Sequence, residues 1–488
     1  MASALPSDVS PAKQDVSVAD FEDFGVVDRA LRFPLKALLG WSAFWLVLGL
    51  FLEVLASFQS THGSFLSGCP YVTFGRLYPA ATNSLIYGWG FNAAFATSYW
   101  ILARLAGSKP VSSASTLVAI VFWNLSVLFG IGGILHGDST GVEWLEMPGY
   151  VAPALWVGFI VIGAQLVLTL RHRAFAQIFI AQWYIVAGFF WFAWMFSITE
   201  LMLVYYPVRG TVQAIIGAWY IQGLFGLWFG SIALGALYYF IPKLTGRTIR
   251  YYTLAVIGFW SYGIFNGWTG IERLAASPVP VWVQTVGFAA SVLSLAPLVI
   301  ISLNLLTTIY KGFSELKGSV AFKFVSIGAV AYAISALQFA CSALGEKGAI
   351  AQLTFEARSQ IELGFLGFFT FSVLGAIYYF LPRAAGRAWR SSGLITLHWV
   401  GSLIGLVLLY VGTLLAGTTQ SAELADPSIN LVQIVEHISG FLTVRTAGFG
   451  ILFLAQLAFT FNVFRTLNPI GSGRVVIEPS TPALEVLS

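Results

Sequence analysis

Charged residues are scarce in this sequence. They make up 9% of its 488 residues, whereas about 25% is usual in a soluble domain. Hydrophobic residues make up 58% and aromatic residues 16%. A chain of this composition cannot cover a folded domain with polar side chains, so it is an integral membrane protein whose partner is the lipid bilayer. The sequence pI of about 8.9 follows from basic loops on one membrane face and gives no reason to expect nucleic acid.

Cysteine and histidine are also rare. Cys69 and Cys341 are too far apart in the sequence to form a metal-binding motif or a disulfide framework. No Walker loop, dinucleotide-binding fingerprint, nucleophile elbow or Cys/His zinc spacing occurs. The chemistry of soluble enzymes is therefore disfavoured. The chain has five histidines, His62, His136, His172, His398 and His437.

Long apolar runs are abundant, and each is close to the roughly 20 residues that a spanning helix needs. They predict an all-α protein with twelve transmembrane helices. Residues 31–466 form this domain, residues 1–30 a disordered cytoplasmic tail and residues 467–488 a second cytoplasmic tail. The twelve runs are 37–58, 84–106, 115–134, 151–170, 177–204, 213–241, 252–271, 281–307, 322–344, 361–382, 394–415 and 444–464.

The distribution of basic residues predicts the orientation. In this topology, 19 of the 25 Lys and Arg residues lie on the side of the amino terminus. Cytoplasmic loops carry the excess of Lys and Arg, so both termini are expected in the cytoplasm and the chain in the inner membrane. Glu53 and Glu200, near the outer ends of spans, are expected to reach the outer headgroups. The aromatic, acidic loop HGDSTGVEWLEMPGY is expected along the membrane interface, although it could instead cap a cofactor.

One membrane-embedded unit is repeated. LGALYYFIPKLTGR ends at Arg247, and LGAIYYFLPRAAGR ends at Arg387, 140 residues later. The same register pairs Gln222 with Glu362. A fainter copy, ATSYWILARLAG, begins at Ala96 and places Thr82 at the equivalent position. About three copies of one unit predict a pseudo-threefold arrangement in which their polar positions face a common centre.

Several of these motifs resemble subunit I of the heme-copper oxidases, most closely the cbb-type branch. They are GRLYPAATN, QWYIVAGFF, ALYYFIPKLTGR, WTGIERL, LGFLGFFTFSVLGAIYYFLPRAAGR and GLITLHWVGS. The resemblance extends from about residue 70 to residue 415, and twelve spans is the number of that family. It implies a respiratory electron-transport protein with cytochrome c-like or other membrane subunits as partners.

The family binds two hemes and one copper through histidine side chains, and none of these histidines is present at the matching positions. The two low-spin heme ligands correspond to Ala81 and Glu362, and the high-spin heme ligand to Gln360. The copper ligands correspond to Gln222, Glu272 and Arg273, and the catalytic tyrosine to Asn266. His398 matches a family histidine that is not a ligand, and is expected to be a satisfied interfacial group. No cofactor is therefore predicted, and enzyme activity stays open.

The replacing residues are mostly polar, which permits two interpretations. They form a functional pocket, or they are ion pairs that fill the space and fix helix register. The favoured hypothesis is a heme-free relative acting as the membrane subunit of a respiratory or redox complex. Proton conduction through buried carboxylates is an optional part of this hypothesis. The alternatives are a working cbb-type cytochrome c oxidase subunit and an ion or small-molecule carrier.

Three geometric predictions follow from this alignment. Ala81, Gln222 and Glu362 should point into one interior space, and no metal should bind at the former copper position. Arg273 should pair with a carboxylate, Glu362 rather than Glu272, because a lone charge near mid-membrane costs roughly 2.5–3.5 kcal/mol.

Overall fold

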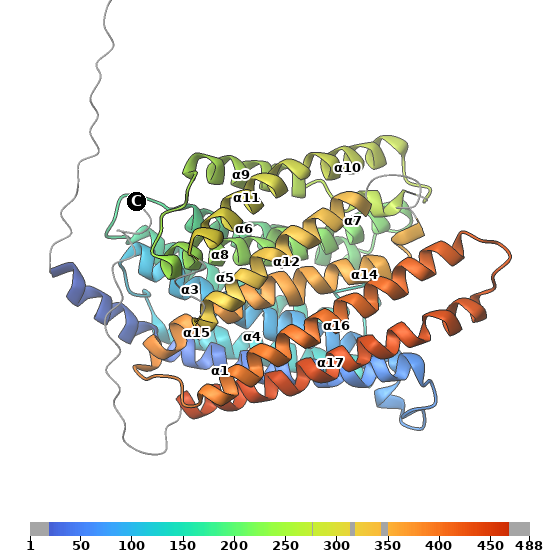
Figure 1. Cartoon of the computed structure of the whole chain (residues 1–488), viewed down its shortest axis with the longest axis horizontal. Helices are drawn as coiled ribbons and strands as arrows, with labels where there is room; N and C mark the ends of the chain where they lie inside the picture. Colours follow the sequence, from blue (N-terminus) through green and yellow to red (C-terminus); the bar gives the residue numbers. More distant parts are fainter. Residues whose placement is uncertain (1–18, 276, 313–317, 343–349, 468–488) are drawn as a thin grey trace, which may run out of the picture.

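The protein is a bundle of long helices that lie side by side (Figure 1). The structure, a computed structural model, describes residues 19–275, 277–312, 318–342 and 350–467, and these contain helices and no strand. The first half comprises α1 (Ala19–Thr61), η1 (Pro70–Val72), α2 (Phe74–Asn83), η2 (Ser84–Gly90), α3 (Phe91–Ala106), α4 (Ser113–His136), η3 (Gly149–Val151), α5 (Ala152–Arg171), α6 (Ile180–Thr199) and η4 (Glu200–Tyr205). The second half comprises α7 (Thr211–Gln222), η5 (Gly223–Gly230), α8 (Ser231–Thr245), α9 (Tyr252–Asn266), η6 (Ile271–Leu274), α10 (Val281–Leu293), α11 (Leu295–Gly312), α12 (Val320–Ser342), α14 (Phe355–Glu362), η7 (Leu363–Phe369), α15 (Thr370–Ala385), α16 (Ser392–Leu424) and α17 (Leu431–Leu467).

The helices agree with a multi-pass membrane protein. Within the described residues, ten helices or continuous helical runs are long and apolar enough to cross a membrane. The continuous run α2–η2–α3 and the shorter α9 lie at the positions of the two other predicted spans. The expected tail is wrong in one part, because α1 already begins at Ala19, so residues 19–30 are helical. Residues 1–18 and 468–488 lie outside the described residues.

The sequence repeat is visible in the backbone. Each copy changes from α-helix to a π-helical segment within two residues of its polar position, at η2, η5 and η7. Each copy then ends at a glycine with a left-handed backbone, with φ of 60° at Gly107, 63° at Gly246 and 66° at Gly386. Only glycine adopts this conformation without steric cost. Three segments of different sequence therefore share one backbone plan.

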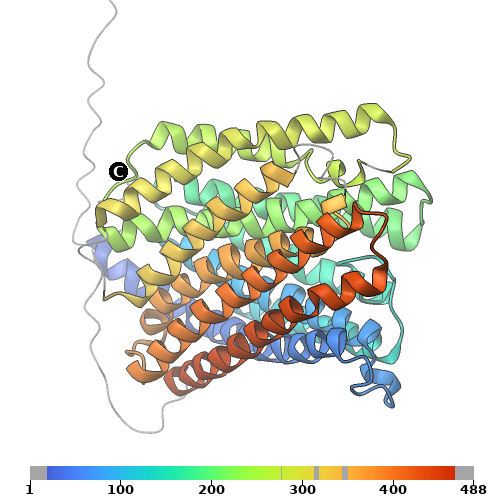
Figure 2. The same cartoon turned by 45° about the vertical axis from the view of Figure 1, so that its right-hand side comes forward.

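The three repeated units form the centre of the bundle. α3, α8 and α15 contact one another pairwise, and η5 contacts η7. Every residue of α3 is buried. On one side of this core, α17 packs against both α1 and α16, and both views show these three helices together (Figures 1 and 2). The three repeated units thus meet inside the bundle.

Candidate functional site

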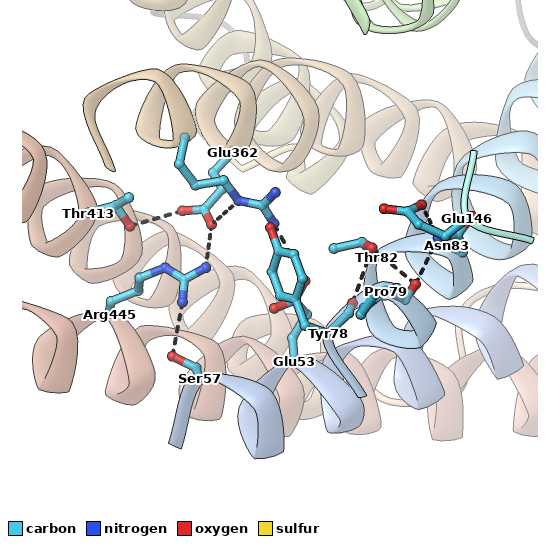
Figure 3. Close-up of polar contacts among 11 residues, drawn as sticks. Glu53, Ser57, Tyr78, Pro79, Thr82, Asn83, Glu146, Glu362, Thr413 and Arg445 are labelled. Atoms are coloured by element: carbon cyan, nitrogen blue, oxygen red, sulfur yellow. Dashed lines mark hydrogen bonds and ion pairs between the residues drawn. The ribbon is translucent and has the colours of Figure 1, made fainter. Parts of the chain in front are cut away.

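Glu362 is the centre of a buried ion-pair network. Its Oε1 accepts hydrogen bonds from Arg445 Nη2 at 2.6 Å and from Arg358 Nε at 3.1 Å. Its Oε2 accepts a hydrogen bond from Thr413 Oγ1 at 2.9 Å. These partners come from α14, α16 and α17, and Figure 3 shows the carboxylate between Thr413 and Arg445. A carboxylate held by two guanidinium groups makes strong, charge-assisted hydrogen bonds.

A second carboxylate completes the network. Arg358 Nη2 lies 3.7 Å from Glu53 Oε1. Glu53 is only 2% exposed and Glu200 8%, so the expectation that these two residues reach the headgroups is wrong. We call Glu53, Arg358, Glu362 and Arg445 the ion-pair network. Two acids and two guanidinium groups give it no net formal charge, which is the condition under which buried charges are tolerated.

The outer loop closes the network from one side. Arg358 Cζ lies 5.0 Å from the ring centroid of Tyr78 and 4.7 Å from that of Trp144, which are cation–π distances. Trp144 is 4% exposed and has a left-handed backbone with φ of 67°, an uncommon conformation for a bulky residue. This conformation belongs to a loop that turns inward. The expectation that the loop lies along the membrane interface is therefore wrong for residues 144–147, which are all buried.

A further polar contact holds the same loop. Asn83 Nδ2 donates a hydrogen bond to Glu146 Oε2 at 2.6 Å (Figure 3). Burial raises the pKa of the Glu146 carboxyl above its usual value, although the hydrogen bond from Asn83 lowers it again in part. Glu146 therefore takes up a proton at a higher pH than an exposed glutamate.

Glycines let α17 bring Arg445 close to Glu362. A Cβ atom at Gly412 in α16 would lie 2.8 Å from the Arg445 backbone nitrogen. One at Gly405 would lie 2.8 Å from the Leu452 side chain and 3.0 Å from the Gly448 carbonyl oxygen. Small residues allow two membrane helices to approach this closely. The Arg445 side chain then extends to Glu362 on α14 and to Ser57 Oγ on α1, at 3.1 Å.

Little space remains around the network. A cavity of about 30 Å³ lies among Glu53, Thr82, Trp144, Arg358 and Glu362. One water needs about 10–15 Å³ of such volume, so this cavity has room for about two waters. Ala81 is fully buried in α2, and its methyl group offers no ligand atom.

A second, larger cavity lies on the other side of Phe225 and Ile361, two residues that line both cavities. Its volume is about 110 Å³. Four of the predicted site residues line it, namely Gln222, Asn266, Arg273 and Gln360. Gln222 and Glu362 thus both face the interior, but the space that was predicted to be single is divided in two.

Arg273 does not pair with Glu362, so the prediction of that ion pair is wrong. Glu362 is occupied by two arginines of its own. Glu272 is buried, and its Oε2 accepts a hydrogen bond from the Gly270 backbone N–H at 2.6 Å. Among the described residues, no ion pair or side-chain hydrogen bond of Arg273 is found, and its Nε is buried without a partner. Glu272 and Arg273 are neighbours in the short η6 turn, but they form no ion pair with each other.

Arg358 and Arg445 were missed from the sequence. Arg358 precedes Glu362 by four residues, the spacing at which side chains on a helix meet, so this pair could have been found. Arg445 stands at the start of the last predicted span, where it resembles a loop residue. The helix α17 begins at Leu431, well before the predicted span. Arg445 therefore lies inside the helix and not at its start.

His398 is a satisfied structural group, but a buried rather than an interfacial one. Its ring is fully buried, with Nδ1 2.7 Å from the Tyr378 hydroxyl and Nε2 3.0 Å from Gln456 Oε1. Both ring nitrogens thus have partners, so neither points to a ligand. Cys341 lies near the end of α12 and is exposed.

The residues at the family's ligand positions do not fit hemes or copper. In the described part of the chain, no three His, Cys, Asp or Glu side chains are grouped so that they could hold a metal ion. At the position implied for a low-spin heme ligand, two guanidinium groups bind Glu362, and guanidinium has no lone pair to donate. At the other, the lining contains amides and Arg273, and amides are poor substitutes for imidazole. No chemical step is therefore derived through a heme or a copper ion.

Comparison with known proteins places the chain in a family. Residues 34–451 match the family described as Cytochrome C and Quinol oxidase polypeptide I. The chain is 26% identical over 443 residues to the cbb3-type cytochrome c oxidase subunit CcoN1 of Stutzerimonas stutzeri, which covers 87% of this chain and 92% of that protein. It is 25% identical over 475 residues to a cytochrome c oxidase subunit 1 homolog of Azorhizobium caulinodans, covering 92% and 84%. A chain in the cryo-EM structure of a heme-copper terminal oxidase dimer has the same fold, with a TM-score of 0.73 at 14% identity and coverage of 93% and 89%. This chain therefore belongs to the heme-copper oxidase subunit I family.

Proposed function

We propose that this protein is a heme-free member of its family that serves as the membrane subunit of a respiratory or redox complex. The observation that carries the proposal is the ion-pair network. Arg358 and Arg445 occupy both sides of Glu362, at the position where the family resemblance implies a heme ligand. If the histidine ligand were lost and nothing else changed, the space of the heme would be left as a void. Here charged side chains and Trp144 fill that space, which supports a protein maintained without the heme.

Partner subunits follow from the relatives. The matched proteins are named as subunits of cytochrome c oxidases. We infer that this chain also works in an assembly, in the inner membrane with both termini in the cytoplasm, and that electron transfer takes place on other subunits. The test is purification of the tagged chain from its native membranes, with identification of the subunits that accompany it. Stoichiometric subunits with their own redox cofactors are expected; a chain that purifies alone would contradict the assembly.

A second role, proton transfer, is favoured by one observation. Three buried carboxylates, Glu53, Glu200 and Glu272, each have an oxygen without a hydrogen-bond partner among the described residues. A buried carboxylate in this condition is a place where a proton can be held. The chain reconstituted in vesicles with an internal pH dye should conduct protons, and Glu53→Gln should reduce the rate. Vesicles that are no more permeable than protein-free ones would rule the role out.

A further inference from the structure

The cavity lined by Arg273 has an unusual composition for the interior of a membrane protein. Gln222, Asn266, Arg273 and Gln360 converge on it from α7, α9, η6 and α14. We propose that this Arg273 cavity binds a small monovalent oxyanion of the size of nitrate, nitrite or formate. The inference does not depend on the proposed redox complex, because it uses only the side chains of this cavity.

The charge of the cavity supports an anion. Arg273 carries a guanidinium group, which is always protonated in proteins. Glu272 and Glu143 attract this guanidinium group electrostatically. Among the described residues, however, Arg273 forms no ion pair with either acid, and Glu272 accepts a backbone hydrogen bond instead. Of the residues that line the cavity, none is Asp or Glu. The lining therefore has a net formal charge of one positive unit, and a buried charge without an ion-pair partner is costly.

The hydrogen-bond donors support the same ligand. The side chains of Gln222 and Gln360 make no hydrogen bond to other described residues, so their NH₂ groups are free to donate. The Asn266 amide is partly used, since its Nδ2 donates to the Tyr262 carbonyl oxygen at 3.0 Å. The Tyr262 hydroxyl is also used, because it donates to the Gly226 carbonyl oxygen at 2.6 Å. Donors from a guanidinium group and two amides match an acceptor with several oxygen atoms.

The volume sets the size of the ligand. The cavity has a volume of about 110 Å³. Since one water needs about 10–15 Å³ of such volume, the cavity has room for several waters. A three- or four-atom oxyanion fits in such a space with one or more waters. Glycines keep the space open. A Cβ atom at Gly226 would lie 3.3 Å from Gln222 Nε2 and 3.5 Å from Asn266 Oδ1, and at Gly364 it would lie in open space.

The experiment is a titration of the full chain, purified in detergent, with sodium nitrate and with sodium formate. Ionic strength is kept constant with sodium gluconate, an anion too large for the cavity. The midpoint of thermal unfolding and the heat of binding are both measured. A saturable rise of the midpoint is expected, because a ligand that binds only the native state stabilises it.

Variants locate the site. Arg273→Gln should weaken binding by about ten- to a hundred-fold, since a hydrogen bond to a charged group contributes about 1.5–3 kcal/mol. Gly364→Leu keeps Arg273 but fills the cavity, and it should abolish binding. The matched control is Arg209→Gln, which makes the same charge change at an exposed position and should bind like the unmodified chain.

Two results would overturn the proposal. One is the absence of any saturable response to nitrate and formate in the unmodified chain, which would mean that the cavity contains water alone. The other is saturable binding that persists in both Arg273→Gln and Gly364→Leu, which would place the anion elsewhere. Since Gly364→Leu leaves every charge in place, the test also works if Arg273→Gln does not fold.

Discussion

The two positions where the family resemblance implies metal ligands have been changed in opposite ways. Around Glu362, two acids and two guanidinium groups compensate one another, and about 30 Å³ of space remains. Around Arg273, one guanidinium group faces a cavity of about 110 Å³ whose lining contains no acid. The first position is part of the packed interior. The second faces a larger cavity and carries one charge.

The two positions therefore have distinct physical properties. At the first position, the charges connect α1, α14, α16 and α17, so they now act as a structural link between helices. At the second position, the Arg273 guanidinium group has no ion-pair partner among the described residues, which favours a binding site over a filler. We therefore expect substitutions at the Glu362 position and at the Arg273 position to change the stability of the protein differently.

The largest expected effect is at Glu362. Glu362→Gln leaves Arg358 and Arg445 without their carboxylate, and breaking a buried ion pair on one side costs about 3–5 kcal/mol. The free energy of unfolding should fall by this amount, measured by denaturant or thermal unfolding in detergent. Adding Arg445→Met removes the stranded charge and should restore much of the loss. A single variant that loses less than about 1 kcal/mol, the range of exposed pairs, would show that the network is not buried as described.

The second largest loss of stability is expected when the hydrogen bond from Thr413 in α16 to Glu362 is removed. Thr413→Val keeps the shape but removes the donor to Glu362 Oε2, and a hydrogen bond to a charged group contributes about 1.5–3 kcal/mol. Thr418→Val is the matched control, because Thr418 lies on the same helix and is exposed. The unfolding midpoint should fall for Thr413→Val alone. Equal values for the two variants would contradict the contact.

A somewhat smaller loss is expected from the helix contact. Gly412→Ala places a methyl group 2.8 Å from the Arg445 backbone nitrogen, and overpacking of this kind costs about 1–3 kcal/mol. Gly440→Ala in α17 is the control, since no atom lies within 4 Å of its Cβ. Unfolding of the two variants in the same detergent gives the comparison. A tolerated Gly412→Ala would mean that α16 and α17 separate easily.

The smallest effect is expected at Arg273. In anion-free buffer, Arg273→Met removes a charge that has no partner, so stability should stay the same or rise. In the double variant Arg273→Met with Glu362→Gln, the changes in the free energy of unfolding of the two single variants should add within about 0.5 kcal/mol. The reason is that the two sites share no hydrogen bond or ion pair. Recovery of stability in this double variant, beyond that margin, would revive the direct pair between Arg273 and Glu362.

The sequence was sufficient for the fold because its signals are local and repeated. Apolar runs located the helices, and the match of LGALYYFIPKLTGR with LGAIYYFLPRAAGR predicted units that the structure shows with the same π-helical segments and terminal glycines. The assignment of the family's ligand positions to residues without histidine stays a prediction of the resemblance.

The partners within the site were not predictable in the same way. Arg445 is 83 residues from Glu362, and its position depends on how closely Gly412 lets two helices approach. Trp144 reaches the network because its loop turns inward, which no composition rule for loops predicts. Glu53 looked like a residue at the end of a span, and became buried only when these elements packed around it.

The central claim is that the former ligand positions no longer hold hemes, and absorption spectroscopy tests it most directly. The chain should be expressed with heme available, purified, and measured for a Soret band together with iron and copper by elemental analysis. We predict no Soret band attributable to this chain and no stoichiometric iron or copper. About two hemes per chain, the number that the family binds, would contradict the account.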